Sequence, residues 1–139
     1  MTPHFIIIHH SAISRRFNDN QFDAINRYHV SLGWGKIGYH YLIEPSGLNK
    51  PGRAENEVGA HCKEQSMNFE SLGVCLTGNF DIERPVNFQI YALRDLLRQL
   101  ALKYNIKKDR LFFHRDFAHY KSCPGRFIDR GFIRGLINS

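Results

Sequence analysis

Side chains that can bind a metal ion follow two apolar segments of the chain. His9 and His10 come directly after "FIII", and His114 comes directly after "RLFF". Cys123 lies nine residues beyond His114, in the segment "HRDFAHYKSCPG". Imidazole nitrogen and thiolate sulfur are good ligands for zinc. Two histidines and a cysteine that meet in space would therefore form a zinc site.

Three protein ligands leave the fourth tetrahedral position of zinc open for water, which is the pattern of catalytic rather than structural zinc. Pro124 and Gly125 would fix the turn that aims the Cys123 sulfur. Each residue also has a simpler explanation. A histidine pair at a strand end can bond backbone groups, and an isolated cysteine is often a small buried apolar residue. Spacing alone leaves both alternatives open.

The elements that must position these side chains can be predicted from the apolar pattern. Short β-rich apolar segments predict four strands, at residues 4–8, 39–44, 71–78 and 110–113. Leucines at helical spacing predict a helix over 87–104, and we expect further helices from Asp19 or Asn20 to about Leu32 and over 127–137. Residues 50–70 are polar and contain glycine, which predicts a long irregular connection.

Strands interleaved with helices predict an α/β fold, with a central mixed β-sheet flanked by helices in a single domain. If the strands that precede His9 and His114 are neighbours, their ends lie at one edge of the sheet. Loops that follow strands commonly carry the sites of such folds. We therefore expect the zinc site at this edge, with Cys123 folding back to meet the two histidines.

The composition narrows the function classes. The chain has 139 residues, of which 42% are hydrophobic, as expected for one globular domain and not for a disordered chain. No apolar run approaches the ~18–20 residues of a membrane span. "FIII" is too short for a signal peptide and lacks a basic leader, so we expect synthesis in the cytoplasm.

The three cysteines are irregularly spaced, which argues against a disulfide framework. The net charge of +6 is thinly spread, and we expect no nucleic-acid partner.

Five motifs, in order, resemble the zinc-dependent N-acetylmuramoyl-L-alanine amidases of the type-2 family. That family includes small bacteriophage amidase-type lysozymes and animal peptidoglycan-recognition proteins. The motifs are "IIIHHSA", "GWGKIGYHYLIEPSG", "GRAENEVGAHC", "NFESLGVCLTGNF" and "HRDFAHYKSCPG", within a match from about His4 to Phe132. The likeness is greatest to the short phage enzymes. It implies that residues 1–139 form one catalytic amidase domain without a separate wall-binding domain.

The resemblance implies a role for five residues. His9, His114 and Cys123 match the three ligands of a single zinc ion. Tyr39 in "GYHY" matches the family's catalytic tyrosine, and Lys121 matches a catalytic lysine of the phage members. Tyr39 as a hydrogen-bond donor and Lys121 as a cation would stabilise the oxyanion that forms when an amide carbonyl is attacked.

For other motif positions, the resemblance does not assign a single role. His40, His61 and Asn68 fall near the family's substrate groove, where substrate binding and a structural role are both open. His10 lies where relatives vary, and we expect it to be structural. Some cytoplasmic recycling amidases use Asp as the third ligand. Cys123 at that position points away from the recycling branch.

The implied reaction is hydrolysis of the amide bond between N-acetylmuramic acid and L-alanine in peptidoglycan. The resemblance predicts a phage or prophage endolysin that lyses the host cell. Without a signal peptide, it would wait in the cytoplasm until another protein breached the membrane. We expect a monomer with no membrane span and with peptidoglycan as its partner.

Two other functions remain as alternatives. A recognition domain would hold muropeptide without cutting it, but binding alone does not need the zinc ligands together with Tyr39 and Lys121. Some phage lysozymes also bind a phage RNA polymerase, with help from an N-terminal extension. This chain starts almost at its first expected strand, so a polymerase partner is unsupported.

Overall fold

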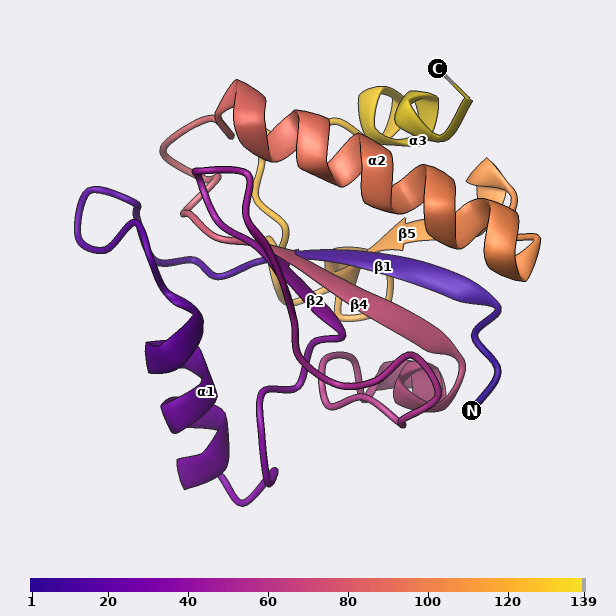
Figure 1. Cartoon of the computed structure of the whole chain (residues 1–139), viewed down its shortest axis with the longest axis horizontal. Helices are drawn as coiled ribbons and strands as arrows, with labels where there is room; N and C mark the ends of the chain where they lie inside the picture. The colour runs from indigo at the N-terminus through magenta and orange to yellow at the C-terminus, as the bar shows by residue number, and fades with distance from the viewer. Residues whose placement is uncertain (139) are drawn as a thin grey trace.

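The computed structural model describes residues 1–138, whose strands form one five-stranded mixed sheet (Figure 1). The strands are β1 (Phe5–His10), β2 (Tyr41–Ile43), β3 (Asn49–Pro51), β4 (Ser71–Leu76) and β5 (Leu111–Phe113). Their order across the sheet is β3-β2-β4-β1-β5. Only β2 and β3 pair antiparallel among these strands, and the other pairs are parallel. The predicted α/β fold with a mixed sheet is confirmed, and β3 was not predicted.

Helices cover both faces of the sheet (Figure 1). They are α1 (Phe22–Ser31), α2 (Asn87–Tyr104) and α3 (Arg130–Asn138), with short 3-10 segments η1 (Glu64–Phe69), η2 (Lys108–Arg110) and η3 (His114–Asp116). In Figure 1, α2 and α3 lie on one side of the sheet and α1 lies on the other. The predicted bounds of α2 are confirmed.

The outer helices begin later than predicted, because polar side chains shape the turns before them. The Asn18 side chain accepts a hydrogen bond from the backbone N–H of Asn20, so a turn precedes α1 and neither Asp19 nor Asn20 caps it. The Asp129 carboxylate accepts the backbone N–H of Phe132 (2.8 Å), which sets the start of α3 at Arg130.

The two faces of the sheet carry different chemistry, because successive residues of a strand point to opposite faces. Ile6 and Ile8 of β1 pack with the buried leucines of α2 in the main core. Ile7 packs on the opposite face with Met67 of η1. His9 follows Ile7 by the same alternation, so its ring lies on the η1 side of the sheet.

The register of the parallel strands brings two histidines together. Ile8 of β1 pairs with Phe113 of β5. The residue after each of these two is a histidine. The ring centroids of these histidines, His9 and His114, lie 4.6 Å apart. The expectation that these strands are neighbours is confirmed, although β5 is the edge strand of the sheet and β1 lies inside it.

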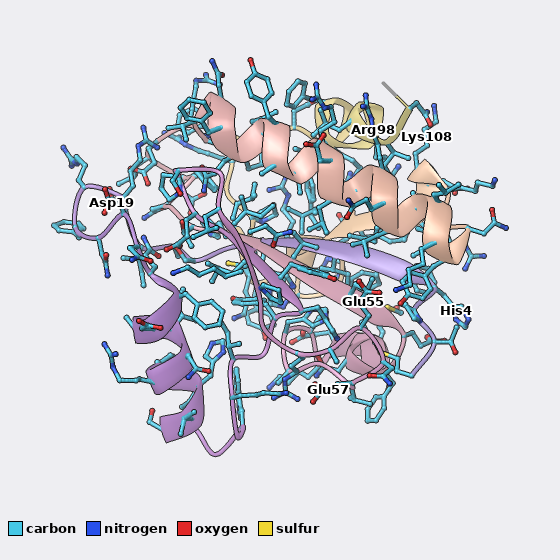
Figure 2. The ribbon with its side chains drawn as sticks, viewed as in Figure 1. His4, Asp19, Glu55, Glu57, Arg98 and Lys108 are labelled. Atoms are coloured by element: carbon cyan, nitrogen blue, oxygen red, sulfur yellow. The ribbon has the colours of Figure 1, made fainter. Side chains whose placement is uncertain are left out.

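Glu55, labelled in Figure 2, joins the loop after β3 to the C-terminal end of α2. Its carboxylate accepts hydrogen bonds from Lys103 (2.8 Å), Tyr104 (2.5 Å) and Tyr41. Burial alone would raise the pKa of Glu55, but these hydrogen bonds outweigh it and lower the pKa to about 2. A carboxyl group whose pKa is lower in the folded state stabilises the fold above its ordinary pKa and loses that effect as the pH falls.

We therefore expect Glu55→Gln to lower the free energy of unfolding at pH 7 by about 1–3 kcal/mol. The difference from the unmodified protein should shrink as the pH falls from about 4.5 towards 2. Urea unfolding at several pH values measures both effects. Asp95→Asn is the control, because Asp95 is an exposed carboxylate paired with Arg94 and should change stability by less than about 0.5 kcal/mol. An equal loss at pH 7 and pH 3 would contradict the assigned role of the Glu55 charge.

Candidate metal centre

Three predicted ligands meet at the carboxyl ends of β1 and β5. One ligand atom from each of His9, His114 and Cys123 lies within 4.8 Å of the other two, and all three residues are buried. The Cys123 sulfur is 3.8 Å from Nδ1 of His9. A tetrahedral zinc ion requires its nitrogen and sulfur ligands to lie about 3.3–3.8 Å from one another. The His9–Cys123 distance and the donor atoms of the cluster therefore suit a zinc site.

The loop after β5 returns Cys123 to the two histidines. The backbone N–H of Arg115 donates to the carbonyl oxygen of Cys123 (2.9 Å), which closes the loop on itself. Gly125 has a φ of +106°, and a Cβ there would lie 2.5 Å from the carbonyl carbon of Phe80. Only glycine fits this turn, as expected from the "CPG" segment. The backbone N–H of His10 also donates to the Cys123 sulfur (3.4 Å).

A chain of hydrogen bonds fixes which nitrogen of His9 faces the cluster. The Ser71 hydroxyl donates to the carbonyl oxygen of Met67 (2.6 Å), so its oxygen is left to accept from Nε2 of His61 (3.3 Å). His61 then accepts at Nδ1 from Nε2–H of His9 (2.9 Å). The lone pair of His9 is consequently on Nδ1, which faces Cys123. Such an outer partner sets the tautomer and orientation of a metal-binding histidine.

The protonation states suit metal binding by the histidines. Burial lowers the pKa of His9 well below its ordinary value, and the neighbouring His61 and His114 lower it further. Burial also lowers the pKa of His114. Both rings are therefore neutral at pH 7, as metal ligands must be. Burial raises the pKa of Cys123 to about 12, so the thiol must release its proton to solvent when a metal ion binds the sulfur.

The cluster borders a groove of about 360 Å³. The groove is lined by Trp34, Ala60, His61, Cys62, Lys63, Glu64, Asn68, His114, Tyr120 and Lys121. His114 thus joins the buried cluster to an open surface, and the exposed Lys121 lies on the same wall. Tyr39 is half-buried beside the cluster, with its ring 5.1 Å from that of His9. A buried cluster of possible metal ligands beside an open groove is the arrangement of a catalytic site.

The model of the N-acetylmuramoyl-L-alanine amidase family (Amidase_2) matches residues 1–126. The chain belongs to this family. Its resemblance to the type-2 amidases, inferred from five motifs, is thereby confirmed, and the match includes all three residues of the buried cluster.

Individual relatives of this amidase agree with the family match. It is 37% identical to the endolysin of Enterobacteria phage T3 over 134 residues, which cover 93% of this chain and 85% of the phage protein. Its fold is similar to that of the N-acetylmuramoyl-L-alanine amidase LysC from Clostridium intestinale, with a TM-score of 0.87 and 33% identity over 99% of this chain and 87% of the other. Drosophila PGRP-LB is more distant, with a TM-score of 0.76 and 29% identity over 91% and 78% of the two chains.

Of the three residues that the motifs placed near the family's substrate groove, two line the groove in this structure and one does not. His40 is fully buried, and both of its ring nitrogens are bonded, to Gly73 (3.0 Å) and to the carbonyl of Glu57 (2.8 Å). Its ring therefore holds the loop after β3 and does not face the groove. His61 and Asn68 do line the groove. The Asn68 side-chain oxygen accepts the backbone N–H groups of His61 and Cys62 (both 2.8 Å), so Asn68 also shapes this wall.

His10 has a structural contact, as expected. Its Nδ1 accepts the backbone N–H of Phe80 (3.1 Å), and burial lowers its pKa to about 4. Its ring belongs to the turn after β4 and is not part of the cluster.

Three residues of the site were missed by sequence reasoning. Ser71 ends the hydrogen-bond chain behind His9, and Glu64 and Trp34 line the groove. Glu64 lies in an irregular segment without periodicity. Ser71 begins a predicted strand, but the alternation of a strand does not tell which face meets His9 until the sheet order is known. Trp34 lies in the motif "GWGKIGYHYLIEPSG", but the resemblance assigned it no role.

Gly73 of β4 makes room for the ring of His61. A Cβ at Gly73 would lie 2.5 Å from Cγ of His61 and 2.6 Å from its Cδ2. We expect Gly73→Ala to displace this ring from His9 and to weaken zinc binding by about 10–100-fold, the usual cost of losing an outer partner of a ligand. Competition with a chromogenic chelator measures the affinity.

Gly135→Ala is the matched control, because a Cβ at this glycine of α3 meets nothing within 4 Å. That variant should bind zinc normally and gain a little helix stability. If Gly73→Ala keeps the zinc affinity of the unmodified protein, the support of His9 by His61 has no role in metal binding.

Proposed function

We propose that this amidase cleaves the bond between N-acetylmuramic acid and L-alanine in peptidoglycan, with one zinc ion held by His9, His114 and Cys123. The observation that carries the proposal is the buried His/His/Cys cluster beside an open groove, in a chain that matches the amidase family over residues 1–126. The donor set fits zinc, because two neutral imidazoles and one thiolate supply nitrogen and sulfur ligands.

Zinc in this cluster would supply Lewis-acid chemistry, which polarises an amide carbonyl and activates water. The protein's own residues would then act on the charge that develops on the substrate. Burial raises the pKa of Tyr39 well above its ordinary value, so its hydroxyl keeps its proton and is available as a donor. Lys121 offers an ammonium group on the groove wall. Together they would stabilise the oxyanion of the attacked amide.

The proposed biological role is that of a phage or prophage endolysin that acts on the bacterial cell wall. Residues 1–139 would act as one catalytic domain, and the protein would work as a monomer. Among residues 1–138, no helix combines the length and apolar character needed to cross a membrane. The net charge of +6 suits a substrate that carries carboxylates and lies among anionic wall polymers.

A digest of purified peptidoglycan, followed by mass spectrometry, tests the proposal. The zinc-loaded protein should release stem peptides that begin with L-alanine, and protein treated with a chelator should release none until zinc is restored. Cleavage at another bond would overturn the assigned reaction. Muropeptide that remains bound but intact would indicate a recognition domain instead.

A further inference from the structure

Glu64 lies between two residues of the loop that carries His114 and Cys123. One carboxylate oxygen, Oε1, lies 3.5 Å from Nε2 of His114. The other, Oε2, accepts a hydrogen bond from the Tyr120 hydroxyl (2.7 Å). Glu64 comes from η1, more than forty residues earlier in the chain. Its side chain is only 17% exposed and that of His114 10%, so their contact is partly shielded from water, whereas Tyr120 lies at the surface.

The contact with Glu64 engages one of the two nitrogens of His114. The Tyr120 hydroxyl donates to Oε2 of Glu64, so the carboxyl group acts there as a hydrogen-bond acceptor. Its other oxygen, Oε1, faces Nε2 of His114. An N–H on Nε2 of His114 satisfies it, which leaves the lone pair on Nδ1.

The backbone that presents Glu64 is unusual. Gln65 and Ser66, the next two residues, have φ values of 53° and 59°. Residues other than glycine cost roughly 1–2 kcal/mol each in this left-handed region. Strain of this kind persists where surrounding contacts hold it, and it is concentrated at functional sites. Met67, buried against the sheet, and Asn68, bonded to the backbone of His61, hold the segment from its other side.

We propose that Glu64 is a positioning residue that fixes the tautomer and orientation of His114, with Tyr120 holding the carboxylate in place. The inference rests on the zinc centre proposed above. Metal-binding histidines commonly donate their second N–H to a carboxylate or carbonyl, which also makes them stronger ligands. Here His9 donates to His61 (2.9 Å), and Nε2 of His114 faces Glu64 at 3.5 Å, so each histidine ligand has its own partner.

A competing role for Glu64 is that of a metal ligand. Ligand atoms of Cys62, Glu64 and His114 also lie within 4.8 Å of one another. However, both oxygens of Glu64 already have partners, and the Cys62 sulfur donates to Oε1 of Glu64 (3.8 Å) and to its carbonyl oxygen (3.9 Å). These contacts favour a support for His114 over a second ion.

The test measures zinc affinity by chelator competition for Glu64→Ala, Glu64→Gln and Tyr120→Phe, together with the melting temperature with and without zinc. We expect Glu64→Ala to weaken zinc binding by about 10–100-fold. Glu64→Gln keeps an oxygen that accepts from Nε2–H, so its loss should be smaller. Tyr120→Phe should lose a few-fold. The metal-free melting temperature should change little, while the increase caused by zinc shrinks with the affinity.

Substitution of cobalt for zinc gives a second readout, because its absorption spectrum reports ligand geometry independently of activity. Glu64→Ala should alter this spectrum. Glu70→Ala is the control, since Glu70 lies in the same segment but faces His4, with its side chain 48% exposed. It should leave affinity and spectrum unchanged.

Three results would overturn the inference while leaving the metal centre in place. Affinity and spectrum that match the unmodified protein would show that Glu64 does not position His114. A lower metal-free melting temperature with unchanged affinity would make its role purely structural. Two bound zinc ions, of which both Glu64→Ala and Cys62→Ala lose one, would make Glu64 a ligand. An unmodified protein that binds no zinc would instead overturn the metal centre, and with it this inference.

Discussion

Cys123→Ser should reduce kcat/KM for peptidoglycan by at least about 10³-fold, because the activation supplied by the metal is lost. The cysteine is the only sulfur donor in the proposed ligand set, and a serine hydroxyl is a much poorer zinc ligand than a thiolate. The site is buried, so water would replace the missing sulfur poorly. Equilibrium dialysis should show a matching loss of bound zinc.

Cys62→Ala is the matched control for this variant. Cys62 is as deeply buried and lines the same groove, but it lies outside the proposed ligand set. It should retain one zinc ion and activity within about threefold, because it removes no ligand. Zinc added after chelation should restore the unmodified protein and Cys62→Ala but not Cys123→Ser. A Cys123→Ser variant that keeps both zinc and activity would remove the basis for the metal centre.

The meeting of His9, His114 and Cys123 could be predicted because it depends on simple features of the sequence. Two apolar strands each end in histidine, and parallel strands end at the same side of a sheet. The observed pairing of Ile8 with Phe113 is the one that sets His9 beside His114. The "CPG" segment likewise required a glycine turn after Cys123, and Gly125 has a positive φ.

The supports of the cluster could not be predicted in the same way. His61 and Glu64 come from a segment with no periodicity, and Ser71 begins β4. The directions of all three side chains depend on contacts with distant parts of the chain. The alternation of β4 does place Ser71, Gly73 and Cys75 on the face of His9, but only once the sheet order is known. Strand β3 has three residues and ends in proline, so it gives no alternating pattern.

Tyr39→Phe should lower kcat by about 10²–10³-fold, the usual cost of removing one oxyanion donor, with little change in KM or zinc affinity. Lys121→Met should have a comparable effect on kcat. Neither residue belongs to the proposed ligand set, so equilibrium dialysis should still find one zinc ion in each variant. Initial rates on soluble muropeptide give kcat and KM separately.

The controls separate these roles from general effects of the ring and of the charge. Tyr28→Phe removes a hydroxyl from an exposed tyrosine of α1, and Lys63→Met removes a cation from the same groove as Lys121. Both should keep kcat within about threefold, since they remove no donor to the oxyanion. If Lys63→Met costs as much as Lys121→Met, the groove needs only positive charge. If Lys121→Met raises KM and leaves kcat unchanged, Lys121 binds substrate and does not stabilise the oxyanion. A large loss of kcat in Tyr39→Phe and Lys121→Met, but not in the two control variants, would assign these groups to the chemical step if zinc is retained.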